Sequence, residues 1–157
     1  MKLFKYSLEK SFNELCSSVK ADSKNPVSMQ EIQFRLGTCL HWMINSWERI
    51  KQTSNINRSD DHNSYFSALE YANNQLKHSV KLVELSQTAV KGHTFPMRFP
   101  CRLGTIFFKW AELKPNKRDQ FANYQGLLQG KDIIVTMQQG KDIVFCYFDK
   151  LENEVTP

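Results

Sequence analysis

Apolar residues recur at steps of three and four along the first half of the chain, and this periodicity constrains the fold more than any other feature. At 3.6 residues per turn, such spacing lines one face of a helix. It predicts amphipathic helices over residues 2–21, 28–52 and 64–87. The buried face of the first is expected to hold its regularly spaced apolar residues, Phe4, Leu8, Phe12, Leu15 and Val19. Three such helices joined by polar segments indicate an antiparallel bundle.

Two polar segments separate the predicted helices. Residues 22–26 (DSKNP) are typical of a turn and end the first helix. Ser28 and Glu31 then form a capping-box pattern, in which the serine accepts from a backbone amide of the first turn and the glutamate bonds back to the cap. Residues 53–63 are polar and turn-prone, and we expect them to be a loop.

The pattern changes after Gly92. Residues 95–100 carry two prolines, so this stretch can only be an edge strand or a loop. Residues 102–110 (RLGTIFFKW) are rich in β-branched and aromatic side chains, which favour strands. We therefore expect a short two-stranded β excursion near 94–110, followed by a basic turn at 114–118.

The last segment has two interpretations. The sequence Gly-Lys-Asp-Ile at 130–133 recurs at 140–143, and a hairpin would place a turn at 139–140 between two apolar runs. A helix would contain one interior glycine, which costs about 1 kcal/mol relative to alanine. It would also line one face with apolar residues, Ile134, Met137, Val144, Phe148 and Leu151. We favour a C-terminal helix over 131–152.

The expected fold is therefore mainly α: an antiparallel helical bundle with a short two-stranded β excursion and a C-terminal helix. A length of 157 residues favours a single domain. Within it we expect a helical-bundle core at 1–90, the β excursion at 91–115, and a C-terminal helical part at 116–157.

Positive charge is concentrated in one segment. The whole chain has a net charge of +5, whereas residues 77–118 hold nine lysines and arginines against two glutamates, so the remainder is slightly negative. Such clustering is typical of a surface that meets a phosphate-rich partner or an acidic protein. A solvated basic face with no partner is the alternative.

Several classes of protein are not expected. No run approaches the roughly 18 apolar residues of a membrane span, and charged residues from Lys5 onward interrupt the N-terminus too early for a signal peptide. We expect a soluble cytoplasmic protein with no membrane partner. The cysteines form no C-x-x-C pair and the histidines have no partner at ligand spacing, so neither a metal site nor a cofactor is expected. Cys16 and Cys39 fall in apolar helical patterns and are expected to pack in the core.

The third predicted helix contains the one segment whose side chains suggest a reactive or phosphate-binding site. Tyr71, Asn74 and His78 share a helical face there, and Lys77 and Lys81 flank it. Such a row could hold a phosphodiester, and histidine is suited to proton transfer near neutral pH. The alternative is that Asn74 and His78 form hydrogen bonds to a neighbouring helix or loop.

The stretch Asn73-Asn74-Gln-Leu-Lys-His78 resembles the signature of the HEPN superfamily of small helical-bundle proteins. That signature is an arginine, usually followed by a polar residue, with a histidine five positions after the arginine. Asn74 and His78 match it, whereas Asn73 stands where the arginine would be. The resemblance implies a bundle that dimerises so that two motifs meet in one cleft. Many members are metal-independent endoribonucleases of toxin–antitoxin, antiphage or RNA-processing systems.

The resemblance also implies roles for these residues. The arginine would steady the scissile phosphate, and His78 would assist proton transfer at the 2′-hydroxyl. Asn73 carries no charge, and loss of such a phosphate contact costs on the order of 100- to 1000-fold in rate. Lys77 or Lys81 would replace it only as point charges.

A second candidate surface lies at 94–110, where Arg98, Arg102 and Lys109 alternate with aromatic residues. Aromatics interleaved with bases can bind unpaired nucleotides, although a two-stranded element also needs such aromatics for its own packing.

Two hypotheses follow for the function. The first is a HEPN-like protein that binds RNA, with at most a degenerate or weak endoribonuclease activity. The second is a non-catalytic protein-interaction module, such as a host–phage conflict protein or a regulatory subunit, that docks an acidic partner through residues 77–118.

Overall fold

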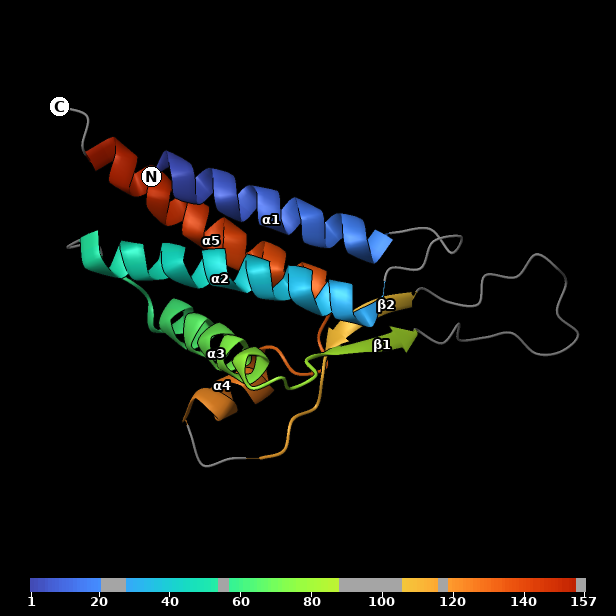
Figure 1. Ribbon diagram of the computed structural model, residues 1–157. Coiled ribbons are helices and arrows are strands. Elements are labelled where there is room, and N and C mark those ends of the chain that lie inside the picture. The colour runs from blue at the N-terminus through green and yellow to red at the C-terminus, as the bar shows by residue number, and fades with distance from the viewer. Residues whose placement is uncertain (21–27, 54–56, 88–105, 116–118, 155–157) are drawn as a thin grey trace, which may run out of the picture.

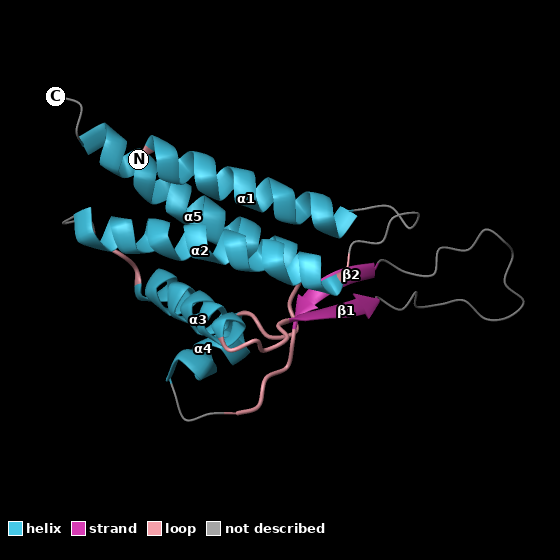
Figure 2. Cartoon of the chain, in the orientation of Figure 1, coloured by secondary structure: helices cyan, strands magenta, loops and turns pink. Residues whose placement is uncertain are grey.

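A computed structural model describes residues 1–20, 28–53, 57–87, 106–115 and 119–154. In this part of the chain five helices and two strands follow one another in the order α1 (Lys2–Lys20), α2 (Met29–Thr53), α3 (Asp60–Lys77), β1 (Val83–Gln87), β2 (Ile106–Trp110), α4 (Asp119–Leu127) and α5 (Ile133–Glu154). The fold is mainly α with a small antiparallel sheet, as the sequence predicts, and the sheet lies at one end of the helices (Figure 2).

Three long helices, α1, α2 and α5, lie side by side, with α3 and α4 against one flank (Figure 1). Lys5, near the start of α1, donates to Asp149 and Glu152 near the end of α5, each at 2.7 Å. These contacts show that α1 and α5 run antiparallel. The core is therefore not confined to residues 1–90, because α5 supplies one of its walls.

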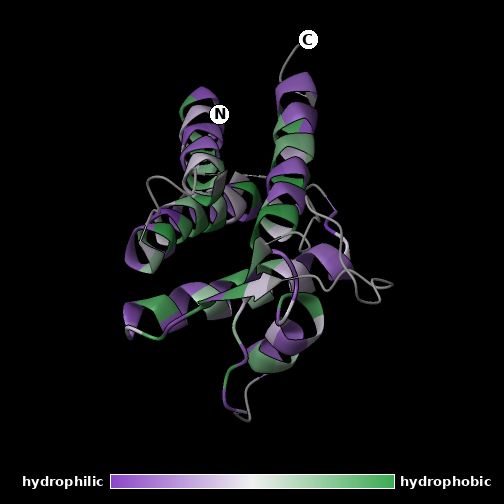
Figure 3. Cartoon of the chain, turned by 90° about the vertical axis from the view of Figure 1, so that its right-hand side faces the viewer, coloured by the Kyte–Doolittle hydropathy of each residue, from purple (hydrophilic) through white to green (hydrophobic). Residues whose placement is uncertain are grey.

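An aromatic cluster joins the elements in the core. Trp47 of α2 stacks on Phe66 of α3 with ring centroids 4.1 Å apart, and Tyr147 of α5 meets Trp47 edge-on at 5.5 Å. Each long helix carries hydrophobic residues along part of its surface and hydrophilic residues along the rest (Figure 3). Within the described ranges, no helix combines the length and apolar character needed to cross a bilayer.

The small sheet is attached to this core by its apolar face. Val83 pairs with Trp110 and Leu85 with Phe108 in antiparallel register. Val83 and Trp110 are fully buried, and the Trp110 indole N–H donates to the Thr136 hydroxyl of α5 at 2.7 Å. The sheet is thereby fixed to the bundle at its base.

The prediction that the third helix runs over 64–87 is wrong at both ends. Helix α3 begins at Asp60, where the Ser59 hydroxyl caps it by accepting from the His62 amide at 3.2 Å. It ends at Lys77, because Ser79 adopts the left-handed conformation with φ 58°. The residues beyond, 83–87, form β1 instead.

The β excursion is confirmed in part. Residues 106–110 form a strand, but its partner is 83–87 rather than a stretch within 94–105. The predicted edge strand at 95–100 lies outside the described residues, and so does most of the positively charged turn predicted at 114–118.

The C-terminal helix is confirmed. Gly140 lies inside α5, and its interior position has a packing reason. A Cβ there would lie 2.5 Å from the Met43 sulfur of α2 and 3.4 Å from the Tyr65 ring of α3.

The two cysteines expected in the core differ in their exposure. Cys39 is fully buried, and desolvation raises the pKa of its thiol to about 12. Cys16 is only partly buried against the core.

Candidate functional site

The chain turns sharply between α3 and β1, and we call residues 77–81 the basic turn. The backbone amides of His78 and Ser79 donate to the carbonyls of Gln75 and Leu76, which closes the end of the helix. The side chains of the turn that carry nitrogen, Lys77, His78 and Lys81, are exposed. Three potentially cationic groups therefore stand within five residues on the surface.

The basic turn is held against α2 by one side chain. The amide nitrogen of Gln33 donates to the Val80 carbonyl at 3.4 Å, and its oxygen accepts from the Leu82 amide at 3.1 Å. A primary amide used in this way satisfies a donor and an acceptor of the backbone, as a neighbouring strand would. The position of Lys81, between the two clamped residues, is thus tied to α2.

Charge pairing distinguishes these two lysines from Lys51. Within the described part of the chain, neither Lys77 nor Lys81 lies at ion-pair distance from a carboxylate, whereas Lys51 pairs with Glu48 and Glu70. An unpaired ammonium can meet a ligand anion without first leaving a protein carboxylate. The two ammonium groups of the basic turn are therefore more available to an anion than that of Lys51.

The lysine predicted on the β excursion is placed differently. Lys109 is half-buried, and its ammonium lies 3.3 Å from the carboxylate of Glu84, its direct cross-strand neighbour. Arg98 and Arg102, which were predicted to act with it, lie outside the described residues.

Tyr71 does not share the exposed row predicted for it. Its side chain is only 2% exposed and lies among the rings of Phe121 and Tyr124 of α4, with centroids 5.8 and 5.5 Å away. Helix α4 covers this side of α3, so the buried arc of α3 is wider than its aliphatic stripe alone indicates. Tyr71 is a core residue.

The remaining motif residues stay near the surface but are not joined to one another. Asn73 and Asn74 are half-buried in the last turns of α3, and His78 follows its last helical residue as the C-cap. Among described residues, none of the three side chains has a hydrogen-bond partner. The alternative expectation, that Asn74 and His78 bond to a neighbouring element, is therefore not met there.

A groove that the sequence did not indicate adjoins the basic turn. Its most prominent wall is Phe34 of α2, which is 64% exposed. The residues lining it come from α2 and the end of α3: Gln30, Gln33, Phe34, Gly37, Thr38, His41 and Leu76. Phe34 lies outside the apolar stripe of α2. An aromatic residue at such a position was the sequence feature that could have indicated this groove.

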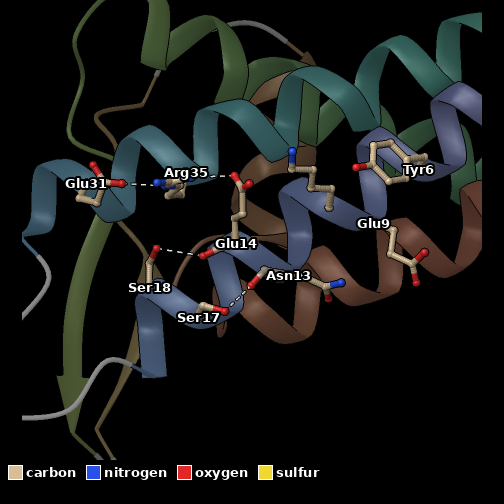
Figure 4. A pocket seen from close by; sticks show the side chains of 9 residues that line it. Tyr6, Glu9, Asn13, Glu14, Ser17, Ser18, Glu31 and Arg35 are labelled. Atoms are coloured by element: carbon tan, nitrogen blue, oxygen red, sulfur yellow. Dashed lines mark hydrogen bonds and ion pairs between the residues drawn. The ribbon is translucent and has the colours of Figure 1, made fainter.

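A larger groove runs between α1 and α2 (Figure 4). Its one guanidinium, that of Arg35, donates to Glu14 at 2.6 Å and to Glu31 at 2.7 Å. The lining also contains Glu9 and Lys10, so three carboxylates face two cations and the groove does not favour an anionic ligand. No three metal-ligating side chains gather anywhere in the described ranges.

Comparison with protein-family models, with curated proteins and with solved structures gives no match. The functional argument therefore depends on the geometry of the basic turn and its surroundings.

Proposed function

We propose that this chain is a HEPN-like helical protein that binds RNA through the basic turn. The observation that carries the proposal is the pair of exposed lysines, Lys77 and Lys81, which have no carboxylate partner among the described residues. Gln33 of α2 bonds the backbone on either side of Lys81. Of the HEPN-like motif positions, Asn73 and Asn74 precede this turn and His78 lies within it.

The physics of the turn favours a polyphosphate. Each lysine that meets a phosphate releases condensed counterions, and this release drives binding without regard to sequence. A turn held in place needs less ordering on binding than a free segment would. His78, which lies between the two lysines in the sequence, has a ring N–H that can donate to a phosphate oxygen.

We further propose that binding occurs without cleavage. Asn73 supplies no charge to the scissile phosphate, and Tyr71 is buried under α4. Purified protein and its His78→Ala variant are expected to leave a labelled RNA equally intact over hours, as judged by denaturing gels. Cleavage by the wild type that the His78→Ala change abolishes would contradict this part of the proposal.

The binding site is tested by removing its charges. The double variant Lys77→Gln/Lys81→Gln is expected to bind a labelled RNA roughly tenfold more weakly than the wild type, since two phosphate contacts are lost. The matched control is Lys2→Gln/Lys150→Gln, which removes two exposed lysines near the start of α1 and the end of α5. Equal loss in both variants would mean that net charge, and not the basic turn, governs binding.

An acidic protein surface is the alternative partner for the same charges. A chain that fails to bind RNA but binds polyglutamate, in a way that depends on Lys77 and Lys81, would favour the protein-interaction hypothesis over the RNA-binding one.

A further inference from the structure

We propose that the groove beside the basic turn, called here the Phe34 groove, receives one unpaired base of single-stranded RNA, which stacks on the Phe34 ring while the adjoining phosphates lie on Lys77 and Lys81. The inference depends on the proposed function and adds a base-binding site on α2, outside the motif residues.

The Phe34 ring is both exposed and supported. The Arg35 guanidinium lies 5.9 Å from its centroid, and two glutamates hold that guanidinium in place. Arg35 lines the α1–α2 groove, whereas Phe34 lines the groove toward α3. Arg35 lies over one face of the ring, so the opposite face is the one left for a ligand.

Gly37 lines the Phe34 groove, and its lack of a side chain leaves the groove open. A Cβ at this position would be in ordinary contact, at 3.6 Å, with the Leu76 side chain, so any larger side chain would extend into the space above. The groove has a volume of about 560 Å³, which is within the range of roughly 300–1,000 Å³ that small-molecule sites occupy. Gln30, Thr38 and His41 also line it and offer polar groups to the rim of a base.

Each lysine of the basic turn is connected to a residue that lines this groove. Leu76 lines it and is followed directly by Lys77. Gln33 also lines it, and the same side chain clamps the residues on either side of Lys81. One wall of the groove is therefore continuous with the basic turn, as a nucleotide with its phosphate requires.

This arrangement selects unpaired nucleotides. Every base presents a π-face on which an aromatic side chain can stack, and alanine substitution at such a contact weakens binding by about 5- to 150-fold. In a duplex those faces are covered by neighbouring bases, and an A-form helix exposes chiefly its backbone and shallow groove. A duplex would reach the lysines but not Phe34.

The test compares a short labelled oligouridylate with an RNA duplex of the same length, by fluorescence anisotropy. Phe34→Ala and Phe34→Leu are expected to weaken oligouridylate binding by about 5- to 150-fold, whereas Phe34→Trp keeps the ring face and retains binding. The matched control is Tyr6→Ala, because Tyr6 is a similarly exposed aromatic (63%) on α1, and its loss is expected to have no effect. Binding of the duplex is expected to be weaker and independent of residue 34.

The outcomes separate this inference from the proposed function. A wild-type chain that binds no RNA overturns both. Binding that responds to Lys77→Gln/Lys81→Gln but not to Phe34→Ala, or that is retained in Phe34→Leu, overturns the base-stacking site alone. Equal affinity for the duplex also overturns it. Because Phe34 is exposed, a melting temperature unchanged from the wild type shows that each variant is folded.

Discussion

Gly140 lies where α5 packs closely against Met43 of α2 and Tyr65 of α3. In Gly140→Ala the new methyl group must displace the buried Met43 side chain, and overpacking of this kind costs about 1–3 kcal/mol. The gain in helix propensity offsets up to about 1 kcal/mol of that. We expect the free energy of unfolding, measured by urea denaturation, to fall by about 1 kcal/mol.

Gly126 of α4 provides the control for this substitution. A Cβ there would meet nothing within 4 Å, so Gly126→Ala is expected to leave stability unchanged or to raise it. A Gly140→Ala protein as stable as the Gly126→Ala protein would show that α2 and α5 are not in close contact at this point.

Thr136 is a buried polar junction between the sheet and the bundle. Its hydroxyl accepts from the Trp110 indole N–H, and its carbonyl accepts from the Tyr65 hydroxyl. Thr136→Val keeps the shape but leaves the indole N–H without a partner, which costs about 1–3 kcal/mol. Thermal unfolding is expected to shift to lower temperature.

Thr38→Val is the matched comparison, because the Thr38 hydroxyl donates only to a carbonyl of its own helix. It is expected to change stability by less than about 0.5 kcal/mol. If the two valine variants unfolded at the same temperature, the hydrogen bond from the Trp110 indole to the Thr136 hydroxyl would contribute nothing measurable to stability.

At the scale of elements, the Gln33 clamp makes a prediction about the basic turn. Gln33→Ala removes the acceptor of the Leu82 amide, so hydrogen exchange at this amide is expected to accelerate relative to the wild type. Exchange in the α5 core is expected to stay unchanged. Gln30→Ala, an exposed glutamine on the same helix, serves as the control. Unchanged exchange at Leu82 in Gln33→Ala would mean that the turn is held by other contacts.

The sequence predicts the elements whose apolar face is continuous. Helices α1, α2 and α5 were found from their periodicity because each buries one stripe along its whole length. The end of α3 was missed because Val80 and Val83 continue the helical spacing beyond Lys77. The left-handed conformation of Ser79, a residue without a marked preference for it, ends the helix instead. Pattern alone therefore did not locate this boundary.

The candidate site was predictable only in part for a related reason. The lysines of the basic turn were found from charge alone. Tyr71 was misplaced because a helix packed by α2 on one side and α4 on another buries more than its aliphatic stripe. The Phe34 groove joins α2 to the end of α3, and its members are separated by about forty positions along the chain, so only the tertiary structure brings them together.

At the scale of the whole molecule, two positive charges outside the basic turn are each paired with two carboxylates. Lys5 is bonded to two carboxylates of α5, and Arg35 to one carboxylate of α1 and one of its own helix. Surface pairs of this kind add little to stability, but they reduce the number of free cations on the faces where they lie. The net charge of +5 is thus unevenly available to an anionic partner, which is the central claim of the RNA-binding account.

The measurement that tests this claim most directly is the salt dependence of RNA affinity. For single strands, each phosphate contact contributes about −0.7 to the slope of log affinity against log salt concentration. Loss of two contacts in Lys77→Gln/Lys81→Gln is therefore expected to make the slope shallower by about 1.4, with Lys2→Gln/Lys150→Gln retaining the wild-type slope. Identical slopes and affinities for the wild type and Lys77→Gln/Lys81→Gln would contradict RNA binding at the basic turn.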